Sequence, residues 1–273
     1  MKVLLTGHSG FIGQSILKLL LKKKIKLSVT KYNNLSIPEE KKITVIDLKK
    51  KFLIKDFDLV IHTAWENLDN YNSKQHIKKI LPSNIKFLIK LIKKGAKNLV
   101  ILGTCFEVGD CSGEIDEKIK LKPKTKYGLA KKKLLFKLLS IKKKYNFNLT
   151  WIRIFYLYGQ TQRNKSLFKQ IQIASKNKNQ KIFEMTSGNQ IRDYLHVDKL
   201  SKKIISISFL KKNLGIINVC SGKPISVKKL VLKWKKRFKW DIEFSFGNKE
   251  QKKYEPLNFW GSTKKFKNVL KQN

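Results

Sequence analysis

The chain has 273 residues, of which 61 are Lys or Arg and 19 are Asp or Glu, so its formal net charge is +42. A chain of this length suits one large α/β unit, or a nucleotide-binding domain with a small second domain. It contains no apolar run long enough to cross a bilayer and starts directly with a strand, without a signal peptide. We therefore expect a cytoplasmic protein with no membrane segment.

The basic excess is almost entirely lysine. Arg, the usual residue for bidentate contacts to bases and phosphates, occurs only at positions 153, 163, 192 and 237. The lysines are spread over nearly every predicted helix, which favours solvated faces and A/T-rich codon usage over a polyanion-binding surface, so we expect no nucleic-acid partner. Under either interpretation, anionic cofactors and substrates should be attracted at low salt.

The cysteines and histidines suggest neither disulfides nor a metal centre. Cys105, Cys111 and Cys220 are odd in number and lack metal-site spacing, which indicates reduced thiols. The four histidines are scattered along the sequence, so we predict no metal site; they are His8, His62, His76 and His196.

The first predicted elements form a strand, a glycine turn and a helix. Residues 2–5 are an apolar strand, and apolar residues recur at helical spacing over 16–21. Between them, Gly7 permits a sharp turn, Gly10 lets a pyrophosphate approach the helix N-terminus, and Gly13 lets the helix pack on the sheet. This context predicts dinucleotide binding rather than a glycine turn without a ligand. The predicted contacts are Gly7, His8, Ser9, Gly10, Phe11, Ile12 and Gly13.

The following elements alternate between strand and helix. Strands are predicted at residues 25–30, 43–46, 58–64, 98–102 and 149–154, and helices at 83–94 and 126–144. This alternation predicts an α/β fold, a Rossmann-type doubly wound parallel sheet over residues 1–158. Residues 159–273 are less regular, with a helix near 167–175 and short strands at 216–219 and 242–246. We expect them to form a smaller C-terminal domain that mainly binds substrate.

Tyr127 and Lys131 are the strongest candidates for acid–base chemistry. They lie four residues apart and therefore share one helix face. A neighbouring ammonium favours the phenolate, so we expect Lys131 to lower the pKa of Tyr127 and to make it a general acid or base. Thr104 ends the fifth strand, where sites form in parallel sheets, and could hydrogen-bond the same substrate oxygen.

Ordered segments along almost the whole chain resemble the extended short-chain dehydrogenases/reductases, the NAD(P)-dependent epimerase/dehydratase family. They are residues 6–13, 47–48, 58–64, 103–104 with 107–109, 127–131, 153–159 and 192–198. The resemblance implies that Thr104, Tyr127 and Lys131 are the catalytic set, that Asp47 and Leu48 flank the adenine, and that Lys131 also holds the nicotinamide ribose. It further implies cofactor contacts at Thr63 and Ala64, and places Arg192 near the substrate nucleotide.

The second strand bears on the choice of cofactor. Proteins that prefer NAD usually end this strand with an acidic residue that binds the ribose 2′-hydroxyl. Residues 30–33 contain no carboxylate, and Lys31 could meet a 2′-phosphate, although in so lysine-rich a chain it could stand there by chance. We therefore favour NADP(H), with NAD(H) as the alternative.

The fifth-strand turn bears on the reaction. Within the family, sugar 4,6-dehydratases place an Asp-Glu pair directly after the catalytic Thr, and fucose-forming epimerase-reductases place a reactive Cys two residues after it. Here Cys105 and Phe106 follow Thr104, which leaves plain hydride transfer. Glu107 admits two interpretations: it replaces the Tyr of the family's Val-Tyr-Gly, or the turn is one residue short and Glu107 occupies the dehydratase position.

Residues 62–71 and the turn at 103–107 resemble nucleotide-sugar 4-ketoreductases of surface-polysaccharide (lipopolysaccharide, O-antigen) synthesis. This implies NAD(P)H-dependent reduction of a 4-keto-6-deoxy nucleotide sugar, with Tyr127 as proton donor. Trp65 would lie near the sugar or, equally, be a core aromatic. The alternatives are a nucleotide-sugar 4-epimerase, a 4,6-dehydratase, and a non-catalytic NADP- or nucleic-acid-binding protein. A homodimer is compatible with the family. The predicted substrate contacts are Trp65, Cys105, Tyr156 and Arg192.

Overall fold

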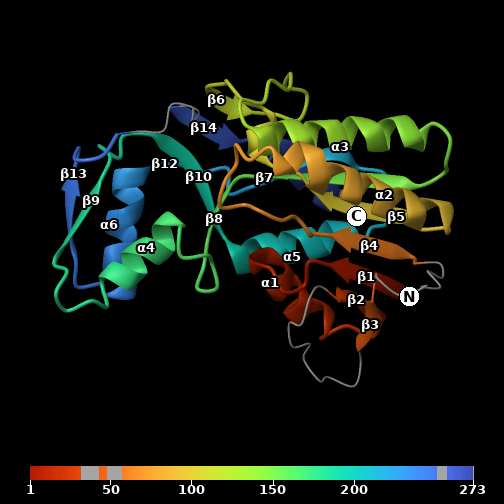
Figure 1. The fold of residues 1–273 in the computed structure, drawn as a ribbon, viewed down its shortest axis with the longest axis horizontal. Helices are drawn as coiled ribbons and strands as arrows, with labels where there is room; N and C mark the ends of the chain where they lie inside the picture. The colour runs from red at the N-terminus through yellow and green to blue at the C-terminus, as the bar shows by residue number, and fades with distance from the viewer. Residues whose placement is uncertain (32–42, 48–56, 251–256, 273) are drawn as a thin grey trace.

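The structure, a computed structural model, describes residues 1–31, 43–47, 57–250 and 257–272. Seven parallel strands form the central sheet in the order β11-β7-β5-β4-β1-β2-β3 (Figure 1). The order reverses between β1 and β4, so this is a doubly wound sheet, and the predicted Rossmann-type fold is confirmed. The strands are β1 (Lys2–Thr6), β2 (Lys26–Lys31), β3 (Ile43–Asp47), β4 (Leu59–His62), β5 (Asn98–Leu102), β7 (Asn148–Ile154) and β11 (Gly215–Val219).

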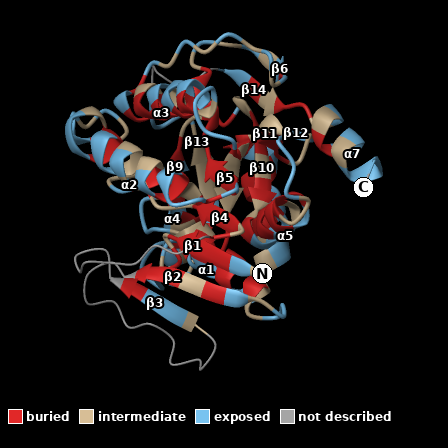
Figure 2. Ribbon diagram, turned by 90° about the vertical axis from the view of Figure 1, so that its right-hand side faces the viewer, coloured by how far each residue is buried: buried red, intermediate tan, exposed pale blue. Residues whose placement is uncertain are grey.

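Helices cover both faces of this sheet. Apolar side chains of α1 (Phe11–Leu20), α5 (Val197–Ser208) and α7 (Lys264–Lys271) pack into one core. On the other face lie α2 (Leu81–Lys93), preceded by the π-helix η1 (His76–Ile80), and α3 (Lys126–Lys142). Figure 2 shows the buried strands between helices whose outer faces are exposed. Among the described residues, no helix is both long and apolar enough to cross a membrane.

A second, smaller sheet lies beside the carboxyl end of the central one. Its order is β12-β10-β14-β6, with β8 paired to β10. Two further strands, β9 and β13, pair beside α4 and α6 and enclose a core that includes Phe168 and Trp234 (Figure 1). The elements are η2 (Cys105–Glu107), β6 (Gly113–Ile115), β8 (Tyr156–Tyr158), α4 (Leu167–Ala174), β9 (Ile182–Met185), β10 (Ile191–His196), β12 (Pro224–Ser226), α6 (Val227–Phe238), β13 (Glu243–Phe246) and β14 (Asn258–Gly261).

The chain passes more than once between these two parts. After β8 and α4 it returns as α5, which packs against α1, and then as β11, which pairs in parallel with β7. The second half of the chain therefore completes the central sheet as well as forming the smaller part. The division at residue 158 stays a prediction about which part binds substrate.

Candidate active site

The N-terminal glycines form a cradle at the carboxyl end of β1. Gly7 has a positive φ of 71°. A Cβ at Gly13 would overlap the Gly7 carbonyl oxygen, and a Cβ at Gly7 would lie 2.6 Å from the Ala64 nitrogen. The first turn of α1 contains no acidic residue, and no side chain caps it. Its free N–H groups and positive dipole end suit a diphosphate, so the residues present fit a dinucleotide cofactor.

A cavity of about 950 Å³ begins at this cradle. It runs past the ends of β4 and β5 to α4 and β10 in the smaller part of the molecule. The lining residues at these places include Gly10, Thr63, Thr104, Phe168 and Tyr194. This position, outside the carboxyl ends of parallel strands, is where doubly wound sheets bind their ligands.

The predicted cofactor residues differ in their position relative to this cavity. Gly7, Gly10, Phe11, Ile12, Gly13 and Thr63 line it, whereas His8, Ser9, Ala64 and Lys131 are not among its lining residues. Thr63 donates from Oγ1 to the Thr6 carbonyl oxygen at 2.7 Å, which ties the strand ends together. The side chains of Lys31 and Asp47, and all of Leu48, lie outside the described residues.

Thr104 and Tyr127 line one wall of the cavity, and Lys131 follows Tyr127 on α3. Thr104 directly follows β5, and Tyr127 is in the first turn of α3, where Thr125 accepts a hydrogen bond from the Gly128 nitrogen at 3.0 Å. The Tyr127 and Thr104 side chains are hydrogen-bonded to each other. Lys131 lies one turn later and donates from Nζ to the Leu102 carbonyl oxygen at 2.7 Å. All three residues are buried.

The pKa of Tyr127 differs from the expectation. Burial raises it above the ordinary value, the neighbouring Tyr71 adds to the rise, and the hydrogen bond with Thr104 opposes it. The predicted lowering by Lys131 is therefore wrong for the ligand-free protein. Lys131 is itself buried, and burial lowers its pKa to about 7. Tyr127 is consequently a neutral phenol that holds a proton it can donate.

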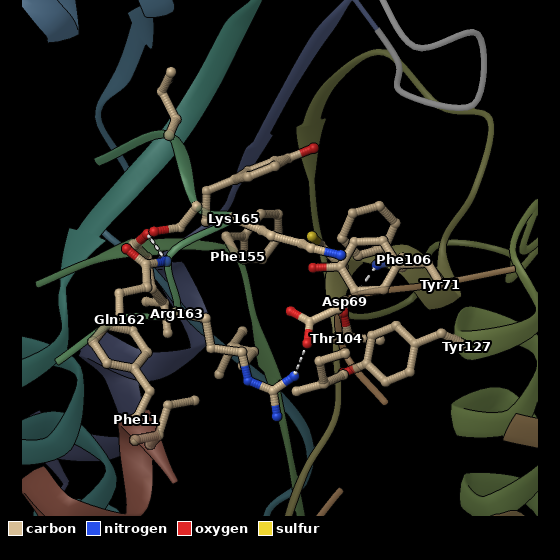
Figure 3. A pocket seen from close by; sticks show the side chains of 18 of the residues that line it. Phe11, Asp69, Tyr71, Thr104, Phe106, Tyr127, Phe155, Gln162, Arg163 and Lys165 are labelled. Carbon is tan, nitrogen blue, oxygen red and sulfur yellow. Dashed lines mark hydrogen bonds and ion pairs between the residues drawn. The ribbon is translucent and has the colours of Figure 1, made fainter. Parts of the chain in front are cut away.

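Aromatic rings surround Tyr127. The ring of Tyr71 stacks on it at 5.3 Å between centroids, and the edge of Trp65 meets it at 5.9 Å. Phe106 lies 4.7 Å from Tyr71 and also lines the cavity (Figure 3). Trp65 belongs to the buried core and also lines the cavity, so its contact with the sugar stays a prediction.

The other predicted substrate residues also line the cavity. Cys105 is buried beside Thr104. The Arg192 guanidinium lies 5.3 Å from the Tyr156 ring, and its Nη1 donates to the Ile191 and Leu257 carbonyl oxygens at 2.9 Å. Their roles in binding stay predictions.

Glu107 does not line the cavity. Its fully buried carboxylate accepts from Arg153 Nε at 2.8 Å and from Trp151 Nε1 at 3.1 Å, and it is not among the cavity-lining residues. The structure thus places Glu107 in an internal ion pair between η2 and β7, where its carboxylate does not line the cavity.

Sequence reasoning missed an ion pair across the cavity. Arg163, after β8, donates from Nη1 to Asp69 Oδ2 at 3.0 Å, and Asp69 follows β4 (Figure 3). Both residues line the cavity, and among the described residues that line it Asp69 is the only Asp or Glu. The two residues are 94 positions apart in the sequence, so no local sequence pattern predicts this pair.

The described residues contain no group of three or more His, Cys, Asp or Glu side chains arranged to hold a metal ion. Cys105, Cys111 and Cys220 are all free thiols.

A glycine cradle after β1 of a doubly wound sheet, with a buried Thr, Tyr and Lys nearby, defines a dinucleotide-dependent enzyme site. Residues 3–219 match the model of the NAD dependent epimerase/dehydratase family, and the chain belongs to that family. The predicted family is therefore confirmed.

Three similar proteins span nearly the whole chain. The dTDP-6-deoxy-L-talose 4-dehydrogenase (NAD(+)) of Aggregatibacter actinomycetemcomitans is 26% identical over 96% of this chain and 100% of its own length. A UDP-glucuronic acid 4-epimerase structure from Bacillus cereus, with NAD, has a TM-score of 0.83 at 20% identity, covering 100% of this chain and 94% of that one. The NAD-dependent NDP-hexosamine 5,6-dehydratase TunA has a TM-score of 0.81 at 20% identity, covering 96% and 88%.

These comparisons give no support to the predicted preference for NADPH. The names of all three proteins mention NAD, and none mentions NADP. The preference rested on Lys31, whose side chain is not described.

Proposed function

We propose that this protein is an NAD(H)-dependent enzyme that reduces the C4 ketone of a nucleotide-linked 6-deoxy sugar to the alcohol. The observation that carries this proposal is that the hydrogen-bonded Thr104 and Tyr127, with Lys131 one helical turn further on, stand at a cavity that also reaches the glycine cradle. The similar 4-dehydrogenase acts, by its name, at C4 of a dTDP-6-deoxy sugar, and its reverse reaction is of the proposed class.

The three side chains divide the work of proton transfer. NAD(H), when bound, supplies the hydride. Tyr127 donates its proton to the oxygen at C4, because burial keeps the phenol neutral until the oxygen develops charge. Thr104 orients that oxygen through its hydroxyl. Lys131, in its charged form, stabilises the phenolate that remains after proton transfer.

The surroundings of the triad favour hydride transfer without loss of water. A 4,6-dehydration needs further acid–base groups at C5 and C6, and the positions after Thr104 hold Cys105 and Phe106. Glu107 is bound to Arg153 and Trp151 outside the cavity, and Asp69 is bound to Arg163.

The direct test follows absorbance at 340 nm with purified protein, NADH or NADPH, and dTDP-4-dehydro-6-deoxyglucose. Loss of absorbance with a preference for NADH supports the proposal. No loss with either cofactor, over several nucleotide 4-keto sugars, overturns it.

A nucleotide-sugar 4-epimerase is the second candidate. The same triad would serve it, and two similar solved structures are titled UDP-sugar 4-epimerases. An epimerase reoxidises its own product, so it would purify with tightly bound NAD and would invert C4 of a UDP-hexose without net absorbance change. Detection of NAD on denaturation together with that inversion would favour this candidate.

A further inference from the structure

We propose that Trp65 is a positioning residue for Lys131, and that His76 holds the indole in place against the ammonium group. The proposal rests on the proposed function in one respect, which is that Lys131 must carry its charge when the cofactor binds. It concerns two residues outside the Thr104, Tyr127 and Lys131 set.

The first observation is the contact between Lys131 and the face of Trp65. Lys131 Nζ lies 3.9 Å from the ring centroid and donates a hydrogen bond to the Leu102 carbonyl oxygen at 2.7 Å. Lys131 and Trp65 are both buried. A cation over an indole is attracted to the negative ring face, most strongly where water is excluded. The indole therefore supplies part of the stabilisation that water would give an exposed ammonium.

The second observation is the tether that fixes the indole. Trp65 Nε1 donates to His76 Nδ1 at 3.2 Å, and His76 Nε2 donates to the Asn70 carbonyl oxygen at 2.9 Å. The two rings are stacked at an interplanar angle of 19°. Since His76 Nδ1 must be unprotonated to accept from Trp65, the tether requires a neutral imidazole. Burial lowers the pKa of His76, against the Asn70 hydrogen bond, and the charge of Lys131 lowers it further.

The third observation joins this tether to the catalytic tyrosine. Trp65 meets Tyr127 edge-on, and His76 lies 5.4 Å from the Tyr127 ring. The loop from Trp65 continues to Tyr71, whose carbonyl oxygen accepts from the Tyr127 nitrogen at 2.8 Å. His76 begins η1, and π-helical turns are rare and concentrate at functional sites. His76 thus holds in place the Trp65 ring, which contacts both Lys131 and Tyr127.

The titratable groups around Lys131 come from four elements. Glu107 on η2 raises the pKa of Lys131, while burial lowers it more strongly, to about 7. His62 on β4 and His76 on η1 are held neutral by burial. Tyr127 on α3 is a neutral phenol. Glu107 therefore supplies the opposing negative charge, although burial raises its own pKa, and the indole face contacts the ammonium directly at 3.9 Å.

The test measures the dissociation constant of NADH, by its fluorescence, between about pH 6 and pH 9 for Trp65→Phe, Trp65→Leu and the unsubstituted protein. In the unsubstituted protein, NADH should bind more weakly at high pH, where Lys131 loses its charge. Trp65→Phe keeps a ring face under the ammonium, so in this variant the weakening should occur at nearly the same pH. Trp65→Leu removes the ring face, so the pH at which NADH binding weakens should be lower by roughly one unit. Trp260→Leu, on β14 and outside the cavity lining, is the matched control.

His76→Leu provides an independent variant in case Trp65→Leu fails to fold. It releases the indole without removing it, and the alkaline weakening should move in the same direction by less. Identical pH profiles for the folded leucine variants, for Trp65→Phe and for the unsubstituted protein would overturn the proposal. NADH binding needs no sugar, so the two proposals can fail separately. If the protein turns over no 4-keto sugar but the leucine variants still shift the pH profile of NADH affinity, the proposed function is rejected and this inference stands.

Discussion

Tyr127 and Lys131 are both buried on one face of α3, and burial moves their pKa values in opposite directions. The spacing of the two residues indicated that they are neighbours, but it could not show that water is excluded from both. Desolvation favours the neutral form of each group, so the free protein holds a protonated phenol beside an ammonium that titrates near neutrality. The site is thus prepared to donate a proton rather than to accept one.

Replacing Tyr127 with Phe tests this role. The variant loses the proton donor while keeping the ring that packs against Tyr71, so hydride transfer should slow by about two to four orders of magnitude. NADH binding should persist. The measurement is the single-turnover rate at 340 nm, with Tyr145→Phe, at an exposed tyrosine, as the control. Near-normal turnover in Tyr127→Phe would contradict the assignment.

His62 makes a second residue-scale prediction, this time on stability. Its Nε2 donates to Asn84 Oδ1 and its Nδ1 accepts from the Thr6 hydroxyl, both at 2.7 Å. Burial lowers its pKa to about 3, with a further lowering by Lys131, so between that value and the ordinary 6.5 the unfolded state binds the extra proton. Stability from this group is complete above about pH 6.5 and is lost as the pH falls toward 3.

Urea unfolding at about pH 7 and pH 5 measures this loss. The free energy of unfolding should fall by about 2 kcal/mol more in the unsubstituted protein than in His62→Gln, whose side chain does not titrate. His196→Gln is the control, because that histidine is partly exposed and should change the difference less. Equal falls in His62→Gln and in the unsubstituted protein would show that the folded protein does not hold His62 neutral at pH 5.

At the scale of elements, the loops after β4 and β8 are joined across the cavity by Asp69 and Arg163. Both side chains are about half exposed, so the pair contributes little to folding. Its larger effect is on the charge of the cavity, because Asp69 repels an anionic ligand and neutralises Arg163.

Asp69→Asn should therefore lower the KM for an anionic nucleotide sugar several-fold while leaving the melting temperature almost unchanged. The effect should shrink as salt is added, because the charges are partly exposed. Asp241→Asn removes the acidic partner of the exposed Lys181 pair, outside the cavity lining, and should not alter KM. A KM that rises in Asp69→Asn would show that the carboxylate contacts the substrate favourably.

The helices and strands differ in how well the sequence predicts them. The first five strands and the glycine turn were predictable, because each strand is rich in apolar or β-branched residues and the turn has special backbone residues, whereas β6, with only three residues, was not predicted. Helix α5 was not predicted, although Leu200, Ile204 and Ile205 are buried at helical spacing and the sequence therefore carries its amphipathic pattern. Strand β12 has three residues and pairs with β10, which lies more than 30 residues earlier, so it carries no local signal.

The candidate site was predictable only in part. Thr104 and Tyr127 each stand at a recognisable strand end or helix start, and both line the cavity. His76 has no such signal, because its importance comes from contacts with Trp65 and Asn70 that exist only after folding. The orientation of Glu107 likewise depended on Arg153 and Trp151, which lie about 45 residues further along the chain.

For the whole molecule, the net charge of +42 is the dominant electrostatic feature. Positive potential over the surface raises the local concentration of anions, and NADH and a nucleotide sugar are both anions. We expect kcat/KM to fall several-fold between about 20 and 200 mM salt while kcat stays constant, because screening acts on encounter rather than on the buried triad. Steady-state rates across a salt series would check this, and an equal fall in kcat would contradict it.

The pairing of β11 with β7 and the packing of α5 on α1 have a consequence for how this chain can be divided. A fragment that ends after β8 would leave the edge of β7 unpaired and the apolar face of α1 uncovered, and such edges promote aggregation. The two parts therefore cannot be exchanged between relatives as separate modules. A transplanted specificity would have to replace the loops and short strands around the cavity and leave α5 and β11 in place.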